Sequence, residues 1–282
     1  MSRRSGLLLG AALAMAMATG CGGQEAAPAS DTEPRLPQTS DPVELDPDDF
    51  TADIDNEYWP MEPGTRWTYR EIDEEGKVIE VVVTVSSETK EIANGVTARV
   101  VRDTVTEDGD IIEDTLDWYA QDPDGTIWYL GENTAEFENG KVATRGGSFE
   151  AGVDGAMAGV IMPGDPEVGM AYRQEYYQGE AEDNGEILSL EEMAEVPAGK
   201  YDDVLLTKDT ITIEPDVLEY KLYAKGVGPV LVFGVSGGAG REDLVSMTTV
   251  APSTAEAAGT TPLGKPTAEP MRSPSQAVRR RR

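Results

Sequence analysis

The sequence predicts an all-β fold, an antiparallel meander that forms a half-barrel or sandwich, with little helix outside a signal segment. Short runs of β-branched and aromatic residues alternate with polar ones. Turn dipeptides separate these runs, among them Asn94-Gly95, Asp108-Gly109, Asp124-Gly125 and Asn139-Gly140. Cys21 is the only cysteine of the 282 residues, so no intramolecular disulfide can support the core.

The first residues have the pattern of an export signal. Arg3 and Arg4 precede an apolar run from Gly6 to Met17, and small residues lead to Cys21. The run is shorter than the roughly 20 residues that a membrane-spanning helix needs. Residues 1–20 are therefore predicted to be a signal peptide. Export by the general route or, from a weak resemblance in Ser2-Arg3-Arg4-Ser5, by the twin-arginine route both stay open.

Ala18-Thr19-Gly20-Cys21 resembles the bacterial lipobox, although Ala18 stands where that motif usually has Leu, Val or Ile. The resemblance implies that Cys21 is acylated and becomes the new N-terminus. Two or three acyl chains make membrane attachment durable, whereas one chain is marginal. We expect an extracytoplasmic protein anchored by palmitate-type lipid on Cys21. It would lie at the outer membrane of a Gram-negative cell or the outer face of a Gram-positive plasma membrane. The alternative is a secreted protein that loses Cys21.

Composition divides the rest of the chain into three parts. Residues 21–49 carry the lipidated cysteine and a disordered tether, because they mix Gly, Pro, Ser and acids without apolar periodicity. Residues 50–250 form a single β domain. Residues 251–282 are predicted to be a disordered tail with a basic end, Arg279–Arg282.

The β domain is expected to begin with a strand in which Trp67 and Tyr69 alternate with basic residues. Similar runs follow along the chain. The predicted strands are Arg66–Arg70, Val78–Val85, Val96–Thr106, Asp114–Tyr119, Thr126–Leu130, Tyr172–Tyr177, Val204–Thr212, Leu218–Ala224, Gly226–Phe233 and Asp243–Thr248.

Three stretches are harder to assign. Residues 146–169 are rich in Gly and Ala, so they are expected to be a loop over one sheet face or a long mobile segment. In such a loop Met157, Ile161 and Met162 would line a flexible lid. Glu186–Glu195 fits either a strand or a short helix. Pro229 lacks a backbone donor, so its strand should lie at an edge or begin at a bulge.

The charge and the missing histidine limit the possible functions. The formal net charge is −30, from 53 acidic and 23 basic residues, with no histidine. Such a chain should repel nucleic acid and anionic lipid. Without histidine, imidazole zinc sites and His-dependent triads are excluded. The acidic surface indicates either a well-solvated protein or a salt-rich habitat.

No motif names a reaction, so no catalytic residue, metal site or cofactor is predicted. Any two of the many acids could be called a glycosidase pair. The acid-rich turns near Asp108 and Asp124 do not have the spacing of a calcium loop. The candidate ligand-binding residues are the aromatics Trp67, Trp118, Trp128, Tyr129 and Tyr176. Filling of the core is the alternative role for them.

Three stretches resemble a family of uncharacterised bacterial envelope lipoproteins: Tyr58–Tyr69, Val196–Val204 and Tyr223–Val230. They read YWPMEPGTRWTY, VPAGKYDDV and YAKGVGPV. The resemblance implies an antiparallel half-barrel or sandwich, similar to the periplasmic lipoprotein-carrier fold. It carries over no catalytic residue.

The expected role is therefore non-catalytic, the binding or carrying of a small apolar, glycan or other envelope-derived ligand. A carboxylate-dependent extracytoplasmic hydrolase and a purely structural envelope protein are the alternatives. A concave pocket lined by Trp and Tyr would favour binding, two facing buried acids would favour hydrolysis, and a filled core would favour a structural part. The oligomeric state stays open.

Overall fold

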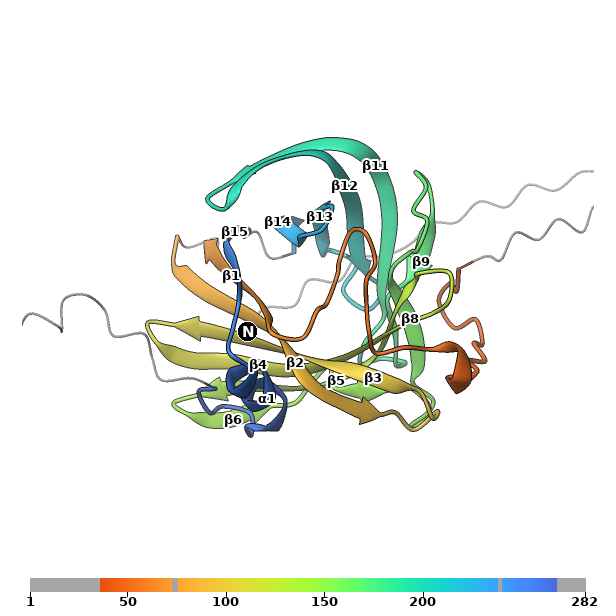
Figure 1. Cartoon of the computed structure of the whole chain (residues 1–282), viewed down its shortest axis with the longest axis horizontal. Helices are drawn as coiled ribbons and strands as arrows, with labels where there is room; N and C mark the ends of the chain where they lie inside the picture. The colour runs from red at the N-terminus through yellow and green to blue at the C-terminus, as the bar shows by residue number, and fades with distance from the viewer. Residues whose placement is uncertain (1–35, 73–75, 238–239, 268–282) are drawn as a thin grey trace, which may run out of the picture. The chain divides into compact units, whose positions relative to one another are not determined.

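The computed structural model describes residues 36–72, 76–237 and 240–267 (Figure 1). The predicted signal peptide, Cys21 and Arg279–Arg282 lie outside the described residues. Within them, one 3-10 helix, Pro47–Asp49, and one α-helix, α1 (Pro252–Thr260), accompany a single antiparallel sheet. The all-β fold class is thus confirmed.

The sheet contains 15 strands in the described part of the chain. All pairings are antiparallel, as the Asn-Gly and Asp-Gly turns predict. The strands are β1 (Thr65–Ile72), β2 (Val78–Glu91), β3 (Thr97–Glu107), β4 (Asp110–Gln121), β5 (Ile127–Glu138), β6 (Lys141–Thr144), β7 (Phe149–Glu150), β8 (Met157–Met162), β9 (Ala171–Arg173), β10 (Glu175–Tyr176), β11 (Asp183–Val196), β12 (Gly199–Ile211), β13 (Leu218–Ala224), β14 (Gly228–Ser236) and β15 (Arg241–Thr249).

The two ends of this sheet meet at one residue. The strand order runs β10-β8-β5-β4-β3-β2-β1-β15-β14-β13-β12-β11-β9, and only Gln174 separates β9 from β10 in the chain. The backbone N–H of Gln174 donates to the carbonyl of Asp183 at 2.7 Å. The sheet therefore curls into a nearly closed barrel.

Closure depends on a close backbone approach at Gly159 of β8. A Cβ atom at this position would lie 2.1 Å from the carbonyl oxygen of Gln174. Only glycine lets the two segments come this close.

The strands present alternate residues to the inside and the outside. On β3, Val101 and Asp103 face the interior cavity described below, whereas Arg102 points outward to α1. The inward positions of β12 and β13 carry Leu205 opposite Tyr223, both almost fully buried. The apolar core thus occupies part of the barrel interior.

Residues 251–267, which the sequence predicts to be part of a disordered tail, are ordered in the structure. Helix α1 packs on the outer side of β2 and β3, and Ser86 Oγ donates to the carbonyl of Ala255 at 2.8 Å. Gly259 permits this packing, since a Cβ there would lie 2.4 Å from Ser86 Oγ. Pro252 starts the helix at its first turn, where a missing N–H costs nothing.

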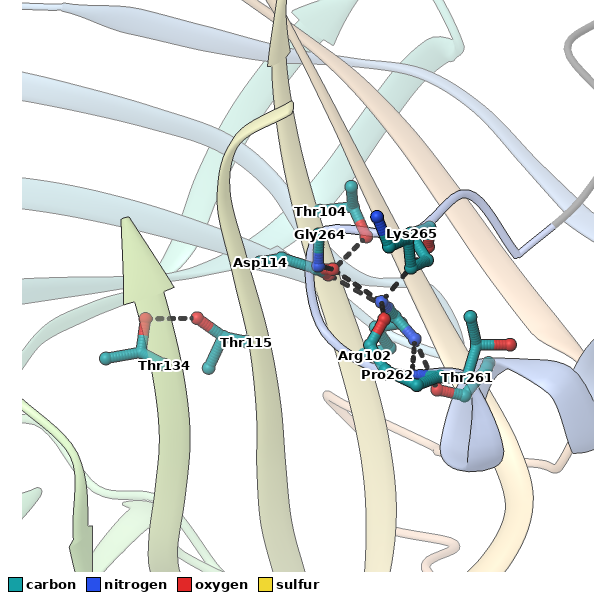
Figure 2. A network of polar contacts seen from close by, with 10 residues as sticks. Arg102, Thr104, Asp114, Thr115, Thr134, Thr261, Pro262, Gly264 and Lys265 are labelled. Carbon is teal, nitrogen blue, oxygen red and sulfur yellow. Dashed lines mark hydrogen bonds and ion pairs between the residues drawn. The ribbon is translucent and has the colours of Figure 1, made fainter. Parts of the chain in front are cut away.

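Arg102 holds the chain beyond the helix. Its guanidinium donates to the carbonyls of Thr261 at 2.7 Å and Ala258 at 3.3 Å, and pairs with Asp114 of β4 (Figure 2). Carbonyls at a helix end lack partners within the helix, so a cation is favoured there. The composition of residues 251–282 does not show that Arg102, far away in the chain, holds this segment.

Residues 36–49, which the sequence predicts to be part of a disordered tether, are also ordered in the structure. The buried guanidinium of Arg173 donates to the carbonyl of Thr39 at 2.7 Å and to that of Ala158 at 3.0 Å. The backbone N–H of Arg173 donates to Pro37 at 2.8 Å. The folded unit therefore begins at Leu36 rather than at residue 50.

The middle of the chain is also more regular than expected. Residues 157–162 are β8, a strand of the barrel wall, so the predicted flexible lid with Met157, Ile161 and Met162 is wrong. Glu186–Glu195 lies within β11. Pro229 stands beside a register shift near the start of β14, which matches the bulge and excludes the edge position.

Candidate ligand cavity

A cavity of about 880 Å³ lies among the inward-facing residues of the barrel. Its walls combine aromatic, aliphatic and carboxylate side chains. The lining residues are Trp59, Trp67, Tyr69, Glu71, Val81, Val83, Val101, Asp103, Glu113, Asp117, Tyr119, Tyr129, Ile161, Glu175, Glu219, Lys221, Tyr223, Pro229, Val232, Gly234, Gly240 and Glu242.

The stretches Tyr58–Tyr69 and Tyr223–Val230 meet at one wall of the cavity. Trp67 Nε1 donates to the carbonyl of Val227 at 2.7 Å, and the Tyr69 hydroxyl donates to the carbonyl of Pro229 at 3.0 Å. Gly228 has a φ of +102°, and a Cβ there would lie 2.8 Å from the Trp59 ring. Gly228 thus lets the backbone pass close to the Trp59 indole.

Four aromatic rings continue from this wall. The centroid of Trp59 lies 5.8 Å from Tyr119 and 5.7 Å from Tyr223, with tilted planes. Tyr119 stacks on Tyr129 at 4.8 Å. These distances are typical of favourable aromatic pairs, so the rings form a continuous apolar face.

The carboxyl groups reach the cavity through the alternation of the strands. On β4 Glu113, Asp117 and Tyr119 face inward, and on β1 Glu71 follows Trp67 and Tyr69. Glu71 is also paired in register with Glu242 of β15. Among the described residues that line the cavity, seven are acidic and one, Lys221, is basic.

Burial shifts the titration of these acids. Desolvation raises the pKa of Asp117 to about 7 and, together with the charge of Asp117, that of Glu132 to about 8. Burial, with the nearby Glu71, raises the pKa of Glu242 to about 7. Burial and neighbouring acids also raise the pKa of Asp103 and Glu175 well above the usual range.

The hydroxyl of Tyr129 contacts two of these carboxyl groups, Asp117 and Glu132. Its hydroxyl lies 2.7 Å from Asp117 Oδ1 and 2.8 Å from Glu132 Oε2. The hydroxyl has one hydrogen, so it can donate to only one carboxylate, and the second contact requires a protonated carboxyl as donor. The Asp117–Tyr129–Glu132 cluster therefore shares a proton, in agreement with the raised pKa values.

Lys221 remains charged despite its position. Burial alone would lower its pKa, but the negative charges of Asp209 and Glu219 raise it well above the usual value. Lys221 Nζ lies 3.0 Å from Asp209 Oδ2 and 3.9 Å from Glu219. The ammonium group is thus already partnered by acids at one side of the cavity.

The structure places the five predicted ligand-binding aromatics in different surroundings. Trp67 and Tyr129 line the cavity. Trp118 lies beneath the Lys90 ammonium at 4.2 Å, Trp128 donates to Asp122 Oδ2 at 2.9 Å, and Tyr176 packs near Arg173. These three are not part of the lining.

Sequence reasoning missed Trp59, Tyr119, Tyr223 and the inward acids. The signal was present in the strands, where Trp67-x-Tyr69-x-Glu71 and Glu219-x-Lys221-x-Tyr223 put charges and aromatics on one face. The inward acids could not be told from surface acids, because an acid-rich sequence gives no separate sign of burial.

Within the described residues, no group of three or more Asp, Glu, His or Cys is arranged to bind a metal ion. No helix in the described ranges is long and apolar enough to cross a membrane.

Comparison with known proteins adds little. No family model matches the chain, and no curated protein matches it. One similar solved structure is a "putative lipoprotein" from Parabacteroides distasonis ATCC 8503, with 13% identity and a TM-score of 0.38. The match covers 68% of this chain and 99% of that one. A TM-score this low supports no argument, so the cavity is interpreted from its own residues.

Proposed function

We propose that this protein is a lipid-anchored extracytoplasmic binding protein that holds a small ligand inside its barrel. The main evidence for this role is the cavity of about 880 Å³ with aromatic and carboxylate walls. Known ligand sites have volumes of roughly 300–1,000 Å³ and combine apolar walls with a few polar groups. A purely structural barrel gains nothing from an unfilled interior, since side-chain packing would stabilise it.

The lining changes the kind of ligand expected. Trp59, Tyr119 and Tyr223 offer an apolar face, but carboxyl groups occupy several other walls. A wholly apolar ligand would leave these polar groups desolvated without partners, which costs free energy. The ligand should therefore have both an apolar and a polar part.

Blocking the cavity tests the binding role. Val83 faces the cavity from β2, and its neighbour Val82 faces the other side of the sheet. Val83→Trp should fill part of the cavity, whereas Val82→Trp adds the same bulk outside it. Full-length protein is purified from its native envelope and analysed by native mass spectrometry.

A bound mass is expected in the wild type and in Val82→Trp, and it should be absent or reduced in Val83→Trp. Absence of any bound mass from all three proteins, together with no binding in the titrations below, would argue against a binding role.

The anchor is proposed from Cys21, which lies outside the described residues. Metabolic labelling with a palmitate analogue should modify the wild type and leave Cys21→Ser unlabelled. Equal labelling of both proteins would exclude acylation at this cysteine.

Hydrolysis is a second candidate, favoured by the Asp117–Tyr129–Glu132 cluster. The two contacting carboxyl oxygens share Tyr129 as a partner, and one group is protonated while the other is ionised. Such a pair has the protonation states of a general acid and base. However, Glu132 does not line the cavity, so binding is the better-supported role. Turnover of glycosides that is lost in Asp117→Asn would favour hydrolysis instead.

A further inference from the structure

The cavity has a strong excess of acidic groups, and they come from six strands. Glu71 lies on β1, Asp103 on β3, Glu175 on β10, Glu219 on β13 and Glu242 on β15, with two more acids on β4. Because they converge from separate strands, the acidic excess is a property of the barrel interior and not of one solvated turn.

The basic group in this lining does not balance the acids. Lys221 Nζ lies 3.0 Å from Asp209 and 3.9 Å from Glu219. The ion pairs of Lys221 thus lie with Asp209 and Glu219 and not with Asp103 of β3 or Asp117 of β4. Glu71 and Glu242 occupy directly opposed positions on neighbouring strands, where like charges destabilise a sheet.

Asp103 gives an independent sign of a missing partner. Its Oδ1 atom is buried and has no hydrogen-bond partner, although the residue lines the cavity. A buried acceptor without a donor costs about 1–3 kcal/mol. A ligand that donates a hydrogen bond at this point would remove that cost.

The aromatic face opposite the acids suits the same kind of ligand. Trp59 has Tyr119 at 5.8 Å and Tyr223 at 5.7 Å, so three tilted π-faces surround one part of the cavity. Cations are attracted to the faces of such rings, and alkyl or aryl groups pack against them.

Resting on the proposed binding role, we infer that the ligand is an organic amine in its ammonium form. Its N–H groups donate to Asp103 and the neighbouring carboxylates. Its apolar part lies against Trp59, Tyr119 and Tyr223. Binding places a positive charge beside these acids and so favours their ionised form, which burial alone disfavours.

Other ligand classes fit less well. A neutral sugar can donate to Asp103 but brings no positive charge to stabilise the ionised form of the acids. A quaternary ammonium compound brings charge but no N–H donor for Asp103 Oδ1. A metal ion is less suitable, since the described residues offer no cluster with ligand geometry.

Matched pairs of small molecules test the charge requirement. Calorimetric titrations of the full-length protein in detergent would use 2-phenylethylamine against 2-phenylethanol, and hexane-1,6-diamine against hexane-1,6-diol. Trimethyl(2-phenylethyl)ammonium separates charge from hydrogen-bond donation. We expect at least one amine to bind about tenfold or more tighter than its alcohol, and tighter than the quaternary compound.

Two variants assign the effect to Asp103. Asp103→Asn keeps the side-chain shape but removes the charge, and it should weaken amine binding about tenfold without changing the binding of the alcohol. Asp108→Asn is the control, since Asp108 is exposed in the β3–β4 turn with a φ of +51°, which asparagine tolerates. Thermal melting would verify that both variants are folded.

The outcomes separate this inference from the proposed function. Amines and alcohols that bind equally well, with binding lost in Val83→Trp, would overturn the amine class and leave the binding role intact. Equal amine affinity in Asp103→Asn and Asp108→Asn would overturn the role of Asp103. Failure of every amine to bind would overturn the inference, and the mass measurement on native protein would then decide the binding role independently.

Discussion

Arg102 of β3 and Asp114 of β4 form an ion pair that is almost completely buried on the outer side of the sheet (Figure 2). Arg102 Nε lies 2.8 Å from Asp114 Oδ1, and Asp114 also accepts from the backbone N–H of Gly264 and from Thr104. The pair thus joins two strands to the segment after α1. Its burial depends on that segment, because the carbonyls of Thr261 and Lys265 cover the guanidinium.

Breaking this pair should destabilise the barrel strongly. Arg102→Met leaves Asp114 buried without its cation, which typically costs about 3–5 kcal/mol. Chemical denaturation would measure the free energy of unfolding. The control is Arg145→Met, because Arg145 is exposed and its change should stay within about 0.5 kcal/mol.

The double variant Arg102→Met/Asp114→Leu separates the two causes. It removes both charges, so it should recover a large part of the loss seen in Arg102→Met. A double variant as unstable as the single one would show that the contacts to α1, not the unpaired carboxylate, dominate.

Closure of the barrel should depend on Gly159. In Gly159→Ala the new Cβ would collide with the backbone of Gln174, and backbone cannot move aside as a flexible side chain can. We expect a loss of about 2–3 kcal/mol in the free energy of unfolding, with faster amide exchange in β8 and β10.

Gly199→Ala is the matched control, since the closest atom outside its chain neighbours lies 3.7 Å from its Cβ position. An equal loss in both variants would contradict the role of the close approach at Gln174, because the entropy of the unfolded chain by itself makes Gly→Ala stabilising.

The protein should be more stable at mildly acidic than at alkaline pH. Asp117 and Glu242 have pKa values of about 7 in the fold, above the unfolded values of about 4. The native state therefore binds more protons than the unfolded state between these values. This stabilisation is complete below about pH 4 and is lost as the pH rises through about 7.

Thermal melting at pH 5 and pH 8 would check this, with an expected decrease of about 5 °C or more at pH 8. The Asp117→Asn/Glu242→Gln variant should show a smaller decrease, since it cannot ionise at these positions. A melting temperature that rises between pH 5 and pH 8 would contradict the assignment.

Tyr129→Phe should destabilise the protein and change its titration. Removing the hydroxyl leaves Asp117 and Glu132 without their shared partner, at a cost of about 1–3 kcal/mol. The hydrogen bond of Tyr129 lowers the pKa of both acids, so its loss should raise these pKa values further. Carbon-detected NMR of the side-chain carboxyl groups would follow the titration of both acids.

Tyr119→Phe is the control, because Tyr119 lines the same cavity but has no hydroxyl contact to this pair. Equal carboxyl shifts in both variants would exclude the shared-proton arrangement.

Much of the fold could be predicted because its signals are local. Alternation in 66–70 and the turns at Asn94-Gly95 and Asp108-Gly109 predict neighbouring antiparallel strands, and these form β1 to β4. Residues 157–162 were missed because β8 is short and follows a glycine-rich segment. The order in residues 251–267 was missed because it comes from Arg102, more than 150 residues earlier in the chain.

The sequence by itself determined the strand periodicity, the absence of disulfides and histidine, and the acidic excess, since each follows from residue type and spacing. Only the tertiary structure decided where the acids lie. Whether Asp103 or Glu242 lies on an open sheet face or in the barrel cavity depends on the curvature that brings β9 and β10 together at Gln174. That curvature arises from pairings between distant strands, which local spacing does not specify. The same periodicity fits a flat sheet or a barrel, but only a barrel encloses these acids with Trp59 and Tyr223.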